Sequence, residues 1–187
     1  MGARTFVALF SGINVGGKRI VGMADLRSML EDLGFDEVAT YVQSGNAVFR
    51  AGSQAGPIAA AVEEKFEKRF GFFSRVMVRD LAWLRKLVAK NPFEGAAEDP
   101  RQLHAYVLQR APGRDGIAGL ARENTGTERF HVREDALYLL TPDGFGRSKF
   151  AALLPARLEV PATARNWRTV TSLLAIAEAA ERAGAAP

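Results

Sequence analysis

The sequence predicts an α/β protein of the α+β type, with two lobes of similar size and a helix at the C-terminal end. Strand-like and helix-like apolar patterns in the first half follow the order β-α-β-β-α-β, which is the split ferredoxin-like unit. The second half repeats this order less clearly. Residues 94–100 form a loop-like stretch between the halves, so we expect one subdomain over 1–90 and a second over 91–187.

The first lobe opens with Thr5 to Phe10, a compact run of β-prone residues that is typical of a central strand. Apolar residues at helical spacing over 23–33 predict a helix that ends at Gly34. An apolar residue at every fourth position over 58–70 predicts a second helix, which ends at Gly71. The other predicted elements are strands over 38–42, 47–50 and 74–79 and a helix over 81–89.

The second lobe begins with an apolar strand over 103–109, and a short helix is expected over 113–123. Residues 128–132 and 136–140 are expected to pair as a hairpin. A short helix is predicted from Lys149 to Leu154. The last helix starts near Trp167, with Thr163 or Asn166 as its cap.

The composition is that of a globular protein, with 48% hydrophobic and 25% charged residues in 187. Because the chain has no cysteine, disulfides, thiolate catalysis and cysteine-based zinc sites are excluded. No stretch approaches the roughly 18 apolar residues that cross a bilayer, and the apolar run near the N-terminus is too short for a signal peptide. We therefore expect a cytoplasmic protein with no membrane partner and no cofactor.

Positive charge is concentrated late in the chain. The net charge is +4, and residues 147–168 hold five cations against one acid, Glu159. Such an excess favours an anionic partner such as nucleic acid or a phosphorylated small molecule. The alternative is a solvated basic surface.

The stretch from Gly12 to Lys18 matches the spacing G-x-x-x-x-G-K of a phosphate-binding loop. The match fails at Arg19, which replaces the magnesium-binding hydroxyl, and at the antiparallel hairpin that follows. A simpler anion site formed by the amides near Gly16 and Gly17 with Lys18 stays open, as does a structural glycine turn.

Three further stretches offer polar groups beside a turn or a helix start. Gln43, Ser44 and Asn46 surround a tight turn, where their alternative role is turn chemistry. Ser148 is a candidate helix cap with Lys149 beside it. Arg165, Asn166 and Trp167 combine a cation, an amide and a flat ring at a helix start, where the helix dipole favours anions, although Trp167 equally suits the helix core.

The titratable residues predict no catalytic apparatus. His104 and His131 both lie on predicted strands, and they could form half of a metal site, but no further ligands follow from spacing, so structural roles are favoured. No serine, histidine and carboxylate are arranged as a triad.

With these residues in view, the chain resembles the bacterial family catalogued as domain of unknown function 1697. The resemblance spans nearly the whole chain and implies two subdomains of the ferredoxin-like α/β sandwich type, with mainly antiparallel sheets and a C-terminal helix. The family has no established activity. Members usually carry arginine where this chain has Ser11, and often asparagine where it has Arg168, so a ligand-binding charge would be shifted to Arg168 or lost. The resemblance rests on Gly12 to Lys18, Met23, Leu26, Thr40 to Asn46, Phe49, Asn91-Pro92-Phe93, Gly146, Ser148, Thr163, Arg165-Asn166-Trp167 and Thr169-Val170.

The sequence favours a binding module for a phosphate-bearing ligand, either nucleic acid or a nucleotide. The alternatives are an enzyme that acts on a phosphorylated small molecule and a protein-interaction role without a small ligand. No catalytic residue and no metal ligand are assigned. The candidate ligand-binding residues are Asn14, Gly16, Gly17, Lys18, Gln43, Ser44, Asn46, Ser148, Lys149, Arg165, Asn166 and Trp167.

Overall fold

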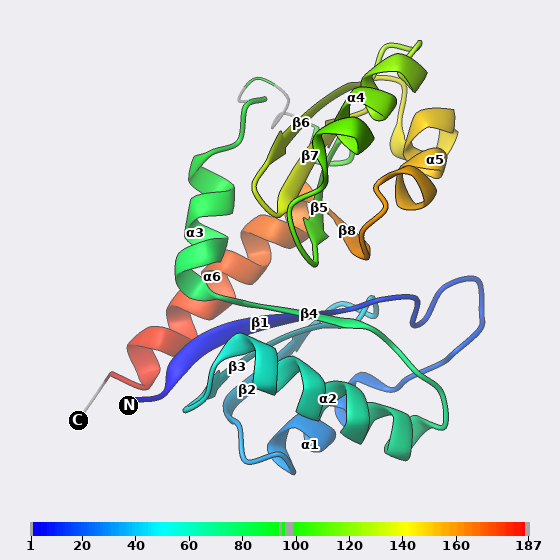
Figure 1. Cartoon of the computed structure of the whole chain (residues 1–187). Helices are drawn as coiled ribbons and strands as arrows, with labels where there is room; N and C mark the ends of the chain where they lie inside the picture. The colour runs from blue at the N-terminus through cyan, green and yellow to red at the C-terminus, as the bar shows by residue number, and fades with distance from the viewer. Residues whose placement is uncertain (1, 94, 96–98, 186–187) are drawn as a thin grey trace. The chain divides into compact units, whose positions relative to one another are not determined.

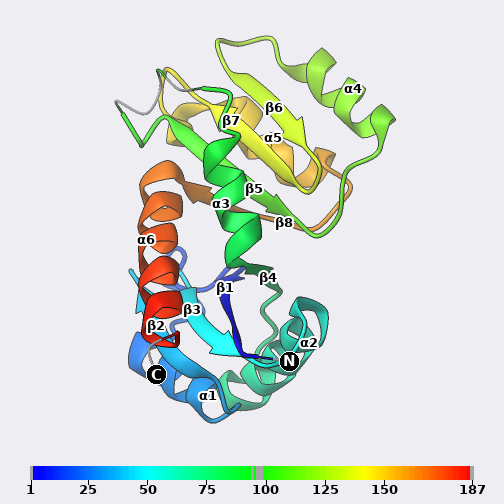
Figure 2. The same ribbon diagram turned by 90° about the vertical axis from the view of Figure 1, so that its left-hand side faces the viewer.

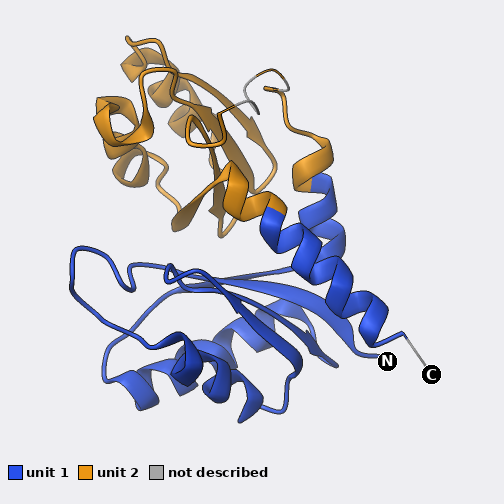
Figure 3. Ribbon diagram, turned by 180° about the vertical axis from the view of Figure 1, so that it is seen from behind, with its two compact units in different colours: residues 1–86, 172–187 blue, residues 87–171 orange. Residues whose placement is uncertain are grey.

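The computed structural model describes residues 2–93, 95 and 99–185. They form two compact units, Met1–Lys86 with Ser172–Pro187 and Leu87–Thr171, shown in blue and orange in Figure 3. The sequence predicts two continuous halves, 1–90 and 91–187. In the structure, the end of the last helix belongs to the first unit instead. The linker expected at 94–100 falls partly on residues 94 and 96–98, which lie outside the described residues.

The first unit is a ferredoxin-like α/β sandwich, as predicted. Its sheet has four antiparallel strands in the order β2-β3-β1-β4 (Figure 1). The two predicted helices fall between strands one and two and between strands three and four. The elements are β1 (Arg4–Phe10), α1 (Met23–Glu31), β2 (Asp36–Tyr41), β3 (Asn46–Ala51), α2 (Ala55–Phe70), β4 (Val76–Asp80) and α3 (Leu81–Ala89).

The core of the first unit lies between the sheet and the helices α1 and α2, which cover one face of it (Figure 2). Phe6, Ala8 and Phe10 point to this face because side chains alternate along a strand. Thr5 points to the opposite face, where its hydroxyl donates to Glu181 of α6 (Trp167–Ala183) at 2.6 Å. The final turns of α6 therefore belong to this unit.

The second unit repeats the same topology, with four antiparallel strands in the order β6-β7-β5-β8. Two ferredoxin-like subdomains are thus confirmed. Within the described residues, no helix is long and apolar enough to span a bilayer. The elements are β5 (Leu103–Leu108), α4 (Arg114–Glu123), β6 (Arg129–Arg133), β7 (Ala136–Leu140), the short 3-10 turn η2 (Phe145–Arg147), α5 (Lys149–Arg157), β8 (Ala162–Asn166) and the start of α6.

Strand β8 is the element that the sequence analysis missed. From the sequence, Thr163 and Arg165 are expected in a polar loop before the last helix. In the structure, both side chains are buried on one face of an edge strand that pairs with β5. The strand completes the second sheet and leads directly into α6. It thereby places residues 163–166 of the motif against β5.

The helices α4 and α5 pack on one face of this second sheet, where Tyr106 and Leu108 of β5 meet Leu120 and Leu154. On the other face, the hydroxyl of Tyr138 donates to the carbonyl of Leu87 at 2.7 Å. His104 shares the face of Tyr106 and Leu108, because it lies two residues before Tyr106 on the strand.

Candidate functional site

The glycine-rich stretch of the first unit folds as a small hairpin. The amide of Lys18 donates to the carbonyl of Val15 at 3.1 Å, and the amide of Asn14 donates to the carbonyl of Arg19 at 3.1 Å. The central residues, Gly16 and Gly17, have φ of 59° and 72°. Two positive φ angles inside a two-residue loop are typical of a type I′ turn. The glycines therefore shape a turn, and an anion site at their amides stays a prediction.

The side chain of Asn14 fastens this hairpin to the neighbouring turn. Its Nδ2 donates to the carbonyl of Val21 at 3.0 Å and to that of Gln43 at 2.8 Å, while its Oδ1 accepts from the Val21 amide at 2.8 Å. The amide group is thus fully used in joining two loops. Lys18 and Gln43 remain exposed on the resulting surface.

The turn over 42–45 is likewise held from inside. Asn46 is fully buried, and its Nδ2 donates to the carbonyl of Tyr41 and to the Oγ of Ser44, each at 3.1 Å. Gly45 has φ of 68°, and a Cβ there would lie 2.6 Å from Cδ1 of Ile13. Gly45 and Asn46 therefore serve this turn, which is the structural alternative considered for the motif.

Two candidate residues of the second unit act at helix starts. Ser148 caps α5, since its Oγ accepts from the amide of Ala151 at 2.9 Å and donates to Glu128. Asn166 caps α6, since its Oδ1 accepts from the amide of Thr169 at 2.8 Å. Asn166 was one of the two caps expected for this helix.

Arg165 and Trp167 are buried, with 8% and 6% of their surface exposed. Arg165 donates from Nη1 to the Oγ1 of Thr163 at 2.7 Å, and burial lowers the pKa of its guanidinium to about 10. The ring of Trp167 lies 6.2 Å from that of Tyr138. These two residues belong to the interior of the second unit, on the sheet face away from His104.

Beside β5 the second unit has a hollow of about 560 Å³, which we call the His104 pocket. Three segments form it: the turn that precedes β5, the loop that follows β7, and the end of β8. Side chains that bear charge or hydrogen-bonding groups dominate its wall. Its lining residues are Asp99, Arg101, Gln102, His104, Pro142, Asp143, Gly144, Phe145, Gly146, Arg147 and Asn166.

His104 is the buried polar group of this pocket. Its side chain is 9% exposed, and its ring stacks on Phe145 with centroids 3.7 Å apart. Within the described residues, its Nδ1 is buried without a hydrogen-bond partner. Burial lowers the pKa of the imidazole to about 4, so the ring is neutral at physiological pH. An unsatisfied buried nitrogen is costly unless something pairs with it.

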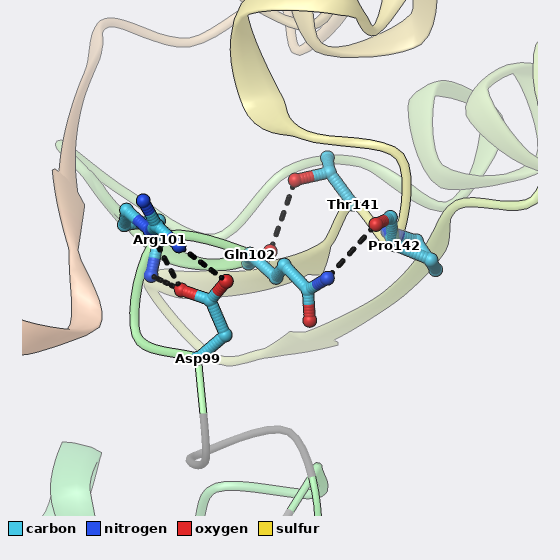
Figure 4. A network of polar contacts seen from close by, with 5 residues as sticks. All are labelled: Asp99, Arg101, Gln102, Thr141 and Pro142. Atoms are coloured by element: carbon cyan, nitrogen blue, oxygen red, sulfur yellow. Dashed lines mark hydrogen bonds and ion pairs between the residues drawn. The ribbon is translucent and has the colours of Figure 1, made fainter.

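A network of polar contacts fixes the rim of the pocket (Figure 4). Asp99 accepts two hydrogen bonds from the Arg101 guanidinium, at 3.0 and 3.1 Å, and these bonds lower the pKa of its carboxyl. Gln102 donates from Nε2 to the carbonyl of Pro142 at 2.9 Å, and Thr141 donates to the carbonyl of Gln102 at 3.0 Å. These bonds join the turn before β5 to the loop after β7.

Three arginines surround this rim. Arg101 and Arg147 line the His104 pocket, and Arg168 lines an adjoining hollow of about 550 Å³ together with Arg101 and Asn166. Arg168 lies in the first turn of α6, where the helix dipole adds positive potential. Two carboxylates, Asp99 and Asp143, face them, and Asp99 is already paired with Arg101. The wall of the His104 pocket itself carries two arginines and two aspartates, and Arg168 of the adjoining hollow makes the combined charge positive.

The structure groups the predicted site residues into two sets, one in each unit. Asn166, with Gly146 and Arg147 of the neighbouring motif, reaches the His104 pocket. Ser148 and Lys149 line a separate hollow of about 490 Å³ beside Glu128. The candidates from Asn14 to Asn46 all belong to the first unit.

Sequence reasoning did not find Arg101, Phe145 or the role of His104 in a pocket. His104 and Asn166 are direct neighbours across β5 and β8. Recognition of β8 as a strand would have revealed this pairing. His104 and His131 are not adjacent, because β7 separates their strands. Among the described residues, no group of three or more metal-ligating side chains is present.

Comparison with known proteins agrees with the fold and supplies no activity. A family model described as a protein of unknown function, DUF1697, matches residues 3–138. The solved structure of a conserved bacterial protein from Streptococcus pneumoniae is similar, with 20% identity and a TM-score of 0.76, over 94% of this chain and 99% of that chain. A structure of an unknown protein from Galdieria sulphuraria shares 10% identity over 97% and 94% of the two chains, with a TM-score of 0.27. No curated protein matches the chain.

Proposed function

The chain belongs to the DUF1697 family of proteins of unknown function, and we propose that its second unit binds a small phosphate-bearing ligand, of the size of a nucleotide or a sugar phosphate, in the His104 pocket. The observation that carries this proposal is the position of a buried, unsatisfied imidazole in a hollow whose wall also carries Arg101 and Arg147. The volume of about 560 Å³ falls within the range of small-molecule sites.

The chemistry of the wall favours an anion over an apolar ligand. Arg101 and Arg147 present N–H donors, and guanidinium groups match the geometry of phosphate oxygens. Asp99 accepts hydrogen bonds from Nε and Nη2 of Arg101. These two bonds use two of the five N–H groups of the guanidinium, so the other N–H groups are not used by Asp99. Arg168 and the start of α6 add positive potential in the adjoining hollow.

The polar groups at the base of the pocket suggest a second part of the ligand. His104 is neutral and Asn166 is engaged as a cap through its Oδ1, so neither contributes charge. A neutral imidazole offers one donor and one acceptor. These groups suit hydroxyl or ring-nitrogen groups, such as those of a sugar or a base, whereas the arginines suit the phosphate.

A thermal-shift screen of nuclease-treated protein tests this proposal. The probes are inorganic phosphate, AMP, ATP, glucose 6-phosphate and a short single-stranded RNA, at low and high salt. A probe at about one hundred times its dissociation constant adds about 2.7 kcal/mol, which raises Tm by roughly 5 °C or more. A small phosphate that remains bound at high salt agrees with the pocket, whereas RNA binding that salt removes indicates a nucleic-acid surface instead.

Matched variants locate the site. Arg147→Ala should abolish the shift, while Arg122→Ala, which removes an exposed arginine from α4, should leave it unchanged. A shift that survives Arg147→Ala and Arg101→Ala alike, or the absence of a shift with every probe, would contradict the proposal.

A further inference from the structure

The first unit exposes apolar side chains at one end of its sheet. Within the described residues, the most exposed large hydrophobic side chains include Val15, Ile20, Val42 and Phe73, at 68%, 69%, 51% and 43%. Among the described residues, the one other exposed large hydrophobic side chain is Leu153, at 43%, which belongs to the other unit. Exposed aliphatic side chains that gather on one surface mark an interaction site.

Contacts within the unit show that the segments that carry these residues lie side by side. The Asn14 side chain joins the hairpin over 13–20, which carries Val15 and Ile20, to the turn that carries Val42. The amide of Ser11 donates to the carbonyl of Arg75 at 2.9 Å, and this bond holds the segment before β4 alongside. We call the hairpin over 13–20 the basic hairpin.

The charged residues within the segments that form this surface are all positive, and the carboxylate of Asp25, which lies beside Gly22, faces Arg69 at 3.8 Å. Lys18, Arg19 and Arg75 lie in the three segments over 11–22, 41–46 and 71–75, and these segments contain no aspartate or glutamate. The guanidinium of Arg19 lies 5.6 Å from the Phe72 ring centroid, so it is held against the unit, whereas Lys18 stands at the hairpin tip. A partner for this surface must be apolar and acidic.

The same unit carries a hollow of that complementary kind beside β2, with a volume of about 610 Å³, which we call the β2 hollow. Its charged lining residues are three carboxylates, Glu31, Asp36 and Glu37, and one cation, Arg27, which is paired with Glu31 at 2.8 Å. Asp36 and Glu37 make no ion pair within the described part of the chain. Its apolar lining residues are Phe35, Val38, Ala39, Ile176, Ala179, Ala180 and Ala183.

Two features of β2 favour the binding of a segment from another molecule in the β2 hollow. β2 is an edge strand, so one side of its backbone has no strand neighbour in the sheet. Its register shifts between Asp36 and Ala39, and Glu37 has φ of 50°, so the strand is irregular where it borders the hollow. A short inserted hairpin could contact this irregular edge and the apolar face of α6 together.

The two surfaces of one chain cannot meet each other. Tyr41, at the end of β2, pairs with Asn46 next to the turn that Asn14 ties to the hairpin, whereas Asp36 pairs with Arg50 at the opposite end. Five residue steps along a strand separate these ends by roughly 17 Å. A contact between them must therefore join two molecules.

We propose that the basic hairpin of one copy of this chain docks in the β2 hollow of a second copy, with Lys18 near Asp36 and Glu37 and with Val15 or Ile20 against Ile176. The contact is head-to-tail, so a pair of copies keeps one free hollow on the first copy and one free hairpin on the second, and larger rings or chains can grow. A hairpin tip buries little area, so the association is weak and appears at high micromolar concentration.

Sedimentation velocity from about 10 µM to about 1 mM tests this proposal. The wild type should show a sedimentation coefficient that rises with concentration. Lys18→Glu and Glu37→Lys should each weaken self-association by about tenfold or more, because each places like charges across the contact. Lys90→Glu changes the charge equally at an exposed position in the other unit, and it should associate as the wild type does.

The mixture of the two charge variants is the decisive sample. The hairpin of Lys18→Glu and the hollow of Glu37→Lys carry swapped charges, so the mixture should associate more strongly than either variant alone. A wild type that stays monomeric to 1 mM would overturn the proposal. So would a mixture that gains nothing, or a loss of association in Lys90→Glu equal to that in Lys18→Glu.

Discussion

A change of pH from 7 to 5 should destabilise the second unit through one side chain, His104. Burial lowers its pKa from 6.5 to about 4 in the folded protein, because the pocket wall and the stacked Phe145 ring keep water from a charged imidazole. Below pH 6.5 the unfolded chain binds a proton at this position that the folded protein does not take up until pH 4. His104 therefore does not lower the stability of the folded protein above pH 6.5, and its neutral form costs increasing stability as the pH falls from 6.5 toward 4.

The size of the effect follows from the two pKa values. Protonation of His104 in the unfolded chain lowers the free energy of unfolding by about 2 kcal/mol at pH 5 and by about 1 kcal/mol at pH 6. Only His104 contributes to the difference between the wild type and His104→Gln. The pocket carboxylates Asp99 and Asp143 are common to both proteins, so their effects cancel.

The assay uses the fluorescence of Trp167, which lies in the second unit, during urea unfolding. Trp83 belongs to the first unit, so every sample also carries Trp83→Phe. Trp167 is then the one tryptophan whose fluorescence is measured. Between pH 7 and pH 5 the free energy of unfolding of the His104 protein should fall by about 2 kcal/mol more than that of His104→Gln. An NMR titration of His131→Gln, in which His104 is the one remaining histidine, measures the folded pKa directly. Equal losses in the two proteins, or a measured pKa near 6.5, would refute the reasoning.

The remaining predictions concern the turns and caps, each measured as the free energy of unfolding in urea. Gly45→Ala should cost about 3 kcal/mol, because φ is 68° and the new Cβ would meet Ile13 at 2.6 Å. Gly17→Ala has the same backbone strain without a neighbour within 4 Å, so it should cost only about 1 kcal/mol; equal losses would refute the steric argument. Asn166→Ala should cost about 1 kcal/mol through the lost bond to the Thr169 amide, and a stability equal to the wild type would show that the cap is unimportant.

The sequence predicted the fold well wherever hydrophobic periodicity was strong. The apolar stripes of α1 and α2, with glycines that end each helical stretch, and the compact run of β1 gave the first ferredoxin-like unit with its element order. Strand β8 escaped because Arg165 and Thr163 look solvent-exposed as residue types. Their burial depends on partners from the rest of the fold, which periodicity in five residues does not reveal.

The candidate site was predictable only in part, for a related reason. Asn14, Asn46 and Gly45 attracted attention as polar or flexible residues, and the structure shows them holding turns together. The His104 pocket, in contrast, depends on the pairing of β5 with β8 and on a loop that comes forty residues later in the chain. Such proximity is a property of the sheet order, which no local motif encodes.

An amide NMR titration of the nuclease-treated protein with AMP and with inorganic phosphate tests the binding proposal most directly. The account predicts saturable shifts that cluster at the amides of Arg101 to His104, Gly144 to Arg147 and Arg168, and that vanish in Arg147→Ala while they persist in Arg122→Ala. Shifts confined to the hairpin around Lys18, or the same weak shifts at every exposed cation, would contradict it.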